Sequence, residues 1–145
     1  MYIIVSKSIM LINGGYMEDF ISLSQVVDHF QIQGTLISAD PYGFGHINQT
    51  YLAVFNNEGK IIRYILQKIN STLFDPVSKL MRNIELVTEF NRSIIKERGG
   101  DPDRESLTIV RTIDGQTYYK RDESSYFRVY IFIERTIAYQ TVSNP

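Results

Sequence analysis

Cysteine and tryptophan are absent from the sequence, and the only histidines are His29 and His46. Without cysteine the chain can form neither a disulfide scaffold nor a thiolate metal site, and two histidines are too few for a histidine-rich metal centre. The lack of cysteine also fits the reducing cytoplasm, which is the expected location. No apolar run reaches the roughly 20 residues of a membrane-spanning helix, so no membrane partner is expected.

An excess of charge of one sign is missing too. The 15 basic and 16 acidic residues leave a formal net charge of -1. Proteins that bind nucleic acids or anionic membranes usually carry a basic excess, so neither partner is expected. What the chain does contain, 43% hydrophobic and 21% charged residues, is typical of a folded globular domain. Its 145 residues leave room for one such domain.

A secretory signal is not indicated at the start of the chain. The apolar stretches within residues 1–16 are interrupted by the polar residues 6–8, with no basic region before them and no small-residue cleavage site after them. Met17 opens the first well-patterned helix. We therefore interpret residues 1–16 as an upstream extension and residues 17–145 as the domain.

The first half of the domain predicts one helix and three strands. Residues 22–25, Ser-Leu-Ser-Gln, are typical of a capping box at a helix start, and Gly34 ends the helical pattern. The apolar residues at helical spacing are Leu23, Val26, Val27 and Phe30. Strands are predicted near 35–38, 50–55 and 61–69, the last two joined by a turn at residues 56–59.

A long helix and further strands are predicted in the second half. Asp75-Pro76 is typical of a capped helix start, and Gly99-Gly100 of a helix end. The predicted apolar face of this helix consists of Leu80, Ile84, Val87, Ile94 and Ile95. A polar loop at 101–105 follows, and then strands at 107–113, 116–120 and 126–133, the first two joined by the hairpin turn Asp114-Gly115.

This order of elements predicts an α+β fold, with a mostly antiparallel sheet of roughly five strands and the helices packed on one side. Three segments add a resemblance to a known family. Residues 43–51 (GFGHINQTY), 65–70 (ILQKIN) leading to 81–88 (MRNIELVT), and 127–134 (FRVYIFIE) resemble motifs of the N-acetylhexosamine 1-kinase-like branch of the aminoglycoside and choline phosphotransferase superfamily. The resemblance runs from about residue 25 to 139, and the order and spacing of the motifs make it more specific than any one of them.

The resemblance implies the N-terminal, nucleotide-binding lobe of a kinase-like enzyme. The parent enzyme would use ATP and Mg²⁺ to phosphorylate an amino sugar, with the catalytic aspartate and a metal-binding aspartate in a second lobe. No His-x-Asp sequence occurs in this chain. Phosphoryl transfer depends on these groups for positioning and charge neutralisation, so we predict no catalytic or metal-binding residue here, no activity of the chain alone, and no tight cofactor binding.

Ten residues are implied as nucleotide-binding by the resemblance: Gly43, Gly45, His46, Asn48, Gln67, Lys68, Glu85, Phe132, Ile133 and Glu134. Glycines at 43 and 45 let backbone N–H groups approach phosphate oxygens, although a glycine-rich hairpin turn explains the same residues. His46 either donates to a phosphate or is a solvated loop residue. Asn48 is expected to brace the loop rather than contact the nucleotide.

Kinases usually hold phosphates with a strand lysine that pairs with a glutamate on the long helix. Here Gln67 occupies the expected inward position and Lys68 is its neighbour, and because strand side chains alternate, one of the two points into the cleft. Glu85 and Glu89 share one face of the long helix, and one of them is expected to pair with Lys68 or Arg63. The alternative is that both are solvated surface acids, which is the expectation for Glu89. Arg128 is expected to form a structural ion pair, and the backbone of Phe132 to Glu134 to contact adenine.

Two other interpretations were open at this point. The chain could be a non-enzymatic α+β module whose glycine turn binds nothing. A mucin-desulfating label, which relatives in this branch can carry, would be a naming carry-over, because the sulfatase motif C-x-P-x-R needs a cysteine and none is present. We also expect self-association through the surface that a second lobe would cover, which includes the apolar stretch 132–139.

Overall fold

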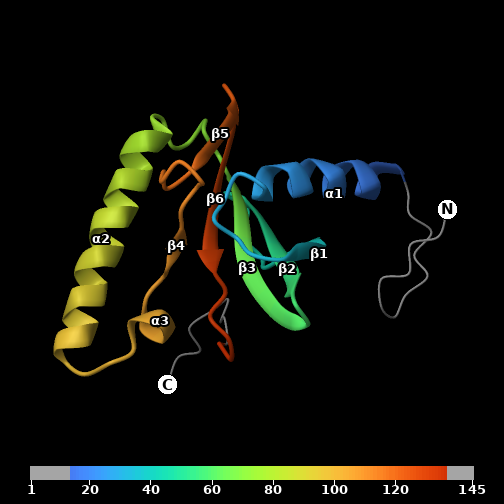
Figure 1. Cartoon of the computed structure of the whole chain (residues 1–145). Coiled ribbons are helices and arrows are strands. Elements are labelled where there is room, and N and C mark those ends of the chain that lie inside the picture. Colours follow the sequence, from blue (N-terminus) through green and yellow to red (C-terminus); the bar gives the residue numbers. More distant parts are fainter. Residues whose placement is uncertain (1–13, 137–145) are drawn as a thin grey trace, which may run out of the picture.

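The computed structural model describes residues 14–136, with side chains from Asp19 onward (Figure 1). Its fold is α+β, as predicted, with a six-stranded antiparallel sheet in the order β1-β2-β3-β6-β4, and with β5 also paired to β6. The elements are α1 (Gly14–Val27), β1 (Thr35–Pro41), β2 (Gln49–Asn57), β3 (Lys60–Ile69), α2 (Val77–Glu97), α3 (Pro102–Glu105), β4 (Ile109–Val110), β5 (Tyr119–Asp122) and β6 (Ser125–Ile131).

The two helices lie against opposite faces of the sheet, which corrects the expectation that both would cover one side (Figure 1). The core under α1 includes Leu66 of β3 and Val129 of β6, whereas the core under α2 includes Ile69 of β3. Successive strand residues point to opposite faces, so Leu66 and Ile69 belong to different faces. The sheet therefore has a core on each face, one under α1 and one under α2.

The α1 helix buries the predicted apolar residues but does not start where predicted. Leu23, Val26 and Val27 are all less than 10% exposed and pack against the sheet. The helix begins at Gly14, however, so residues 22–25 lie inside it and form no capping box. The Ser24 hydroxyl donates to the carbonyl of Ile21 at 2.7 Å, which is the bond of a serine inside a helix, whereas a capping serine accepts from a backbone N–H.

The α2 helix ends as predicted and begins differently. Gly99 has φ +78°, its N–H donates to the Lys96 carbonyl, and the N–H of Gly100 donates to the Ile95 carbonyl, which is the Schellman pattern. At the other end Pro76 occupies the N-cap position and no side chain caps the helix, so the expected capping carboxylate of Asp75 is absent.

The apolar face of α2 is rotated from the predicted one. Val77, Met81 and Ile95 are buried, but the predicted core residues Val87 and Ile94 are 58% and 42% exposed. Two polar residues on the inward line have hydrogen-bond partners. Thr88 donates to the Ile84 carbonyl within the helix, and Arg92 donates to Pro102, Asp103 and Thr108, in and after α3. A polar residue with partners can therefore occupy a line that periodicity assigns to apolar residues.

The turns are better predicted than the pairing around them. Glu58 and Gly59, with φ 52° and 88°, form the two-residue turn between β2 and β3. The Asp114-Gly115 turn also forms, closed by a bond from the Thr112 N–H to the Gln116 carbonyl at 2.9 Å. Its flanking strands β4 and β5 do not pair with each other, because both pair with β6. The predicted hairpin is therefore wrong, and the polar loop at 101–105 contains the one-turn helix α3.

Within residues 14–136, no helix is long and apolar enough to cross a membrane.

Candidate functional site

The loop between β1 and β2 carries both candidate glycines of the phosphate loop. Gly43 has φ +80°, which favours glycine, and a Cβ atom built on Gly43 or Gly45 would meet nothing within 4 Å. A pocket of about 280 Å³ lies on this loop. Its lining consists of Pro41, Tyr42, Gly43, Gly45, His46, Ile47, Asn48, Gln49, Thr50 and Tyr51. A ligand can therefore approach the loop backbone closely.

The loop is held at its base by two hydrogen bonds. The Tyr42 N–H donates to the Thr50 carbonyl at 2.9 Å, which closes the loop between the strand ends. The Asn48 side-chain carbonyl accepts from the Asn70 N–H at 2.9 Å, which ties the loop to the end of β3. Asn48 thus braces the loop, as expected. His46 is exposed and its side chain has no hydrogen bond within the described part of the chain.

A row of three polar side chains crosses the sheet beside this loop. Thr50, Gln67 and Arg128 are register partners on β2, β3 and β6. The Gln67 side-chain amide donates to the Thr50 hydroxyl, and its carbonyl accepts from the Arg128 Nε, both at 2.9 Å. Because Thr50 also lines the loop pocket, the row connects that pocket with Arg128.

The choice between Gln67 and Lys68 is a choice between the two faces of β3. Gln67 lies on the face of α2, together with Arg128, whose guanidinium contacts the buried Met81 of that helix. Lys68 is the register partner of Phe127, which belongs to the core under α1. Gln67 and Lys68 therefore point to opposite faces of the sheet, and Gln67 lies on the face that α2 covers.

Arg128 does not form the expected ion pair. Arg128 is only 9% exposed, and no carboxylate lies within ion-pair distance of it among the side chains of residues 19–136. Its partners are Gln67, the Met81 sulfur at 3.7 Å and the Tyr130 ring, whose centroid is 5.2 Å from the guanidinium carbon. Burial lowers the pKa of Arg128 and, in the same surroundings, raises the pKa of Tyr130. Neutral groups thus replace the carboxylate that a buried cation usually requires.

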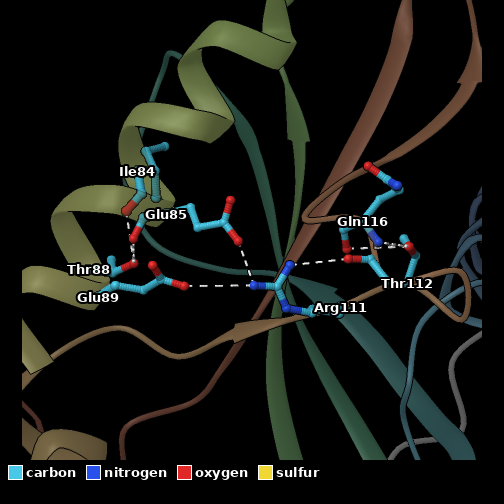
Figure 2. A network of polar contacts seen from close by, with 8 residues as sticks. Ile84, Glu85, Thr88, Glu89, Arg111, Thr112 and Gln116 are labelled. Carbon is cyan, nitrogen blue, oxygen red and sulfur yellow. Dashed lines mark hydrogen bonds and ion pairs between the residues drawn. The ribbon is translucent and has the colours of Figure 1, made fainter.

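Glu85 pairs with neither Lys68 nor Arg63. Figure 2 shows Arg111, which follows β4, between Glu85 and Glu89 of α2. The Arg111 Nη2 lies 2.5 Å from the Glu85 carboxylate and 3.9 Å from that of Glu89. The helix glutamate is therefore tied to the segment between β4 and β5, because that segment, not β3, passes closest to it.

The segment that follows β6, residues 132–134, contacts both β3 and the start of the glycine loop. The Phe132 N–H donates to the Arg63 carbonyl at 3.2 Å, and the Arg63 guanidinium binds both oxygens of Glu134 at 2.8 and 2.7 Å. The Phe132 ring lies under that guanidinium, at 5.4 Å, and meets the Tyr42 ring edge-on at 5.9 Å. Tyr42 begins the glycine loop, so this contact joins the loop to the end of β6. The Ile133 carbonyl accepts from the Thr136 hydroxyl at 3.0 Å.

Of the ten candidate residues, the structure brings together those of the loop, joins Gln67 to them through Thr50, and joins Phe132 to them through Tyr42. Lys68 faces away, and Glu85 is engaged by Arg111. The sequence did not indicate the contact of Tyr42 with Phe132, nor the row in which Thr50 and Arg128 flank Gln67. The strand register would have revealed the row from Thr50 to Arg128, but register depends on pairing that the sequence does not specify.

A metal centre is not formed by the described side chains: between residues 19 and 136, no three His, Asp or Glu side chains are grouped closely enough to hold an ion. Compared with models of known protein families, the chain matches none.

Proposed function

We propose that this chain is the nucleotide-binding part of a kinase-like small-molecule phosphotransferase, in which a second lobe supplies the catalytic and metal-binding aspartates. One observation carries the proposal: the open glycine loop and the polar row from Thr50 to Arg128 lie on one antiparallel sheet, beside a long helix. This arrangement offers backbone N–H groups and a cation to the phosphates of one ligand, as phosphoryl transfer requires.

The proposed roles follow from the geometry of the loop and of β6. ATP phosphates would lie against the backbone at Gly43 and Gly45, where a Cβ would meet no other atom within 4 Å. Adenine would lie by the backbone of residues 132–134, beside the paired rings of Tyr42 and Phe132. The described residues do not fit a magnesium site, so no step is assigned to the metal.

The substrate rests on the resemblance alone, and the location on the absence of cysteine. We propose an amino sugar, phosphorylated at its anomeric hydroxyl by the parent enzyme in the cytoplasm. The described residues supply no general base by motif, so the sugar is expected to bind the second lobe. Self-association through the surface that this lobe would cover belongs to the same proposal.

The test is an amide NMR titration of the 145-residue chain with ATP and with adenosine. We expect shifts at residues 43–50 and 132–134, with a dissociation constant on the order of millimolar, equivalent to about 4 kcal/mol, because the chain offers only one wall of the site. Tight, magnesium-dependent binding would contradict this half-site view.

Two matched glycine variants distinguish ATP binding at the loop from a general effect of backbone strain. Gly43 and Gly59 have φ +80° and +88°, and a Cβ meets nothing within 4 Å at either position. Gly43→Ala is expected to weaken ATP binding several-fold, whereas Gly59→Ala, with the same backbone strain on another turn, leaves it unchanged. Equal effects, or the absence of any ATP shift, would favour the alternative of a non-enzymatic α+β module with an unliganded glycine turn.

A further inference from the structure

Arg128 is a buried cation without a carboxylate partner in the described part of the chain. A guanidinium carries five N–H donors and stays charged, and burying such a group without an anion is unfavourable. Only its Nε has a strong acceptor, the Gln67 carbonyl at 2.9 Å; the Met81 sulfur is a weak acceptor at 3.7 Å. The donor capacity that remains fits an anionic ligand.

Three other arginines near α2 and β3 are already paired with carboxylates. Arg63 binds Glu134 at 2.7 Å, Arg92 binds Asp103 at 2.7 Å, and Arg111 binds Glu85 at 2.5 Å. Each of these pairs is partly exposed, where a carboxylate contributes little to stability. The more buried Arg128, for which an acidic partner would matter most, is the one left with neutral partners.

The Arg128 side chain lies on the same face of the sheet as the side chain of Thr50, at the end of the glycine loop. Neighbouring strands lie about 4.8 Å apart, so β6 is about 10 Å from β2 across β3. The Arg128 side chain extends toward β3, because its Nε reaches Gln67, and Gln67 in turn reaches Thr50 of the loop pocket. The guanidinium therefore lies beyond Gln67, on the same face of the sheet as the Thr50 side chain that borders the loop pocket.

We propose that Arg128 is the phosphate anchor of this site, binding an oxygen of a polyphosphate chain through its Nη2 group, since Nε donates to Gln67 and Nη1 contacts the Met81 sulfur. Gln67 is a positioning residue, since its carbonyl fixes the Nε side of the guanidinium and leaves the other edge for the anion. A guanidinium suits this role because its planar donors match phosphate oxygens. The assignment rests on the proposed function for the nucleotide, but the anion chemistry can be tested without it.

The experiment uses three probes on the 145-residue chain: inorganic tripolyphosphate, adenosine and ATP. The Arg128 Nε–H resonance is followed by NMR, together with the backbone amides. Tripolyphosphate and ATP are expected to shift that resonance, and adenosine is not. Arg128→Met is expected to weaken the binding of tripolyphosphate and of ATP about tenfold or more, because it removes a charge-assisted contact with phosphate. Arg111→Met, which removes an arginine paired with Glu85, is the matched control and leaves binding unchanged.

Two further measurements keep the test decisive if Arg128→Met does not fold. Arg128→Lys retains the charge without the planar fork and should bind tripolyphosphate more weakly than the natural chain. The Arg128 Nε–H shift in the unmodified chain depends on no variant at all. Absence of that shift at saturating tripolyphosphate overturns the anchor.

The outcomes distinguish the anchor from the nucleotide site. If adenosine and ATP bind equally well and Arg128→Met has no effect on either, the anchor role of Arg128 is overturned and the nucleotide site is retained. Tripolyphosphate binding at Arg128 with no advantage for ATP supports the anchor and overturns the nucleotide assignment. Binding of all three probes, with only the anions sensitive to Arg128, supports both.

Discussion

Replacing Gly34 by alanine places a methyl group against the backbone of β2. A Cβ at this position would lie 2.5 Å from the Asn56 carbonyl oxygen and 3.0 Å from the Asn57 Cα. Gly34 also has φ +97°, a region unfavourable for side chains. We expect about 1–2 kcal/mol from the backbone conformation and about 1–3 kcal/mol from overpacking. Because the contact is with backbone, neither strand can yield without disturbing the pairing of Thr35 with Asn56.

Two other glycines separate these contributions. Gly59 has φ +88° with nothing within 4 Å of a Cβ, so Gly59→Ala should lose only the conformational part, about 1–2 kcal/mol. Gly45 has neither feature, and Gly45→Ala should change stability by less than about 1 kcal/mol. Urea unfolding followed by circular dichroism gives all three free energies. If Gly34→Ala loses no more than Gly59→Ala, the close approach of Gly34 to β2 does not exist in solution.

The remaining predictions use the same unfolding assay or NMR titration. Met81→Ala should lose about 2–5 kcal/mol, because Met81 is fully buried under α2, and a loss near zero would contradict that packing. A double-mutant cycle of Glu85→Gln and Arg111→Gln should give a coupling of about 0.5–1 kcal/mol, since the pair is partly exposed. Hydrogen bonds from the Ser124 backbone and hydroxyl lower the pKa of Asp122 from 3.8 to about 2. The stability this provides is present above pH 4 and lost as the pH falls toward 2, so Asp122→Asn should flatten that part of the stability curve, and an unchanged curve would count against it.

The elements that the sequence predicted well depend on local chemistry. The strand predicted at 61–69 is observed at Lys60–Ile69, and the long helix predicted from Pro76 to Arg98 at Val77–Glu97. In both cases the boundary is set by residues next to it in the chain: a glycine turn before β3, and Gly99 with φ +78° after α2. Such signals act over a few residues and can be read without tertiary structure.

The errors arise where several arrangements satisfy the same local pattern. Two lines along α2 were suitable for burial, and the polar Thr88 could join the inward line because its hydroxyl bonds to the helix backbone. Val87 was left exposed as a result. The predicted ion-pair partner of Glu85 was wrong for the same reason. Glu85 pairs with Arg111 because of the path of the chain after β4, and that path depends on the pairing of β4 with β6.

The charges around β3 form a consistent set under the proposed function. Arg128 is the register partner of position 67, and the two side chains share a partly buried face. A lysine at 67 would place two cations on adjacent strands, where like charges in surroundings of low dielectric repel each other strongly. A neutral glutamine avoids this repulsion and positions the guanidinium through its carbonyl. Because Lys68 of β3 lies on the opposite face from α2, Glu85 is available to Arg111. Under the proposed function, Arg128 of β6 carries the positive charge that a kinase usually has at position 67 of β3. This one difference accounts both for a glutamine at position 67 and for the pairing of Glu85 with Arg111.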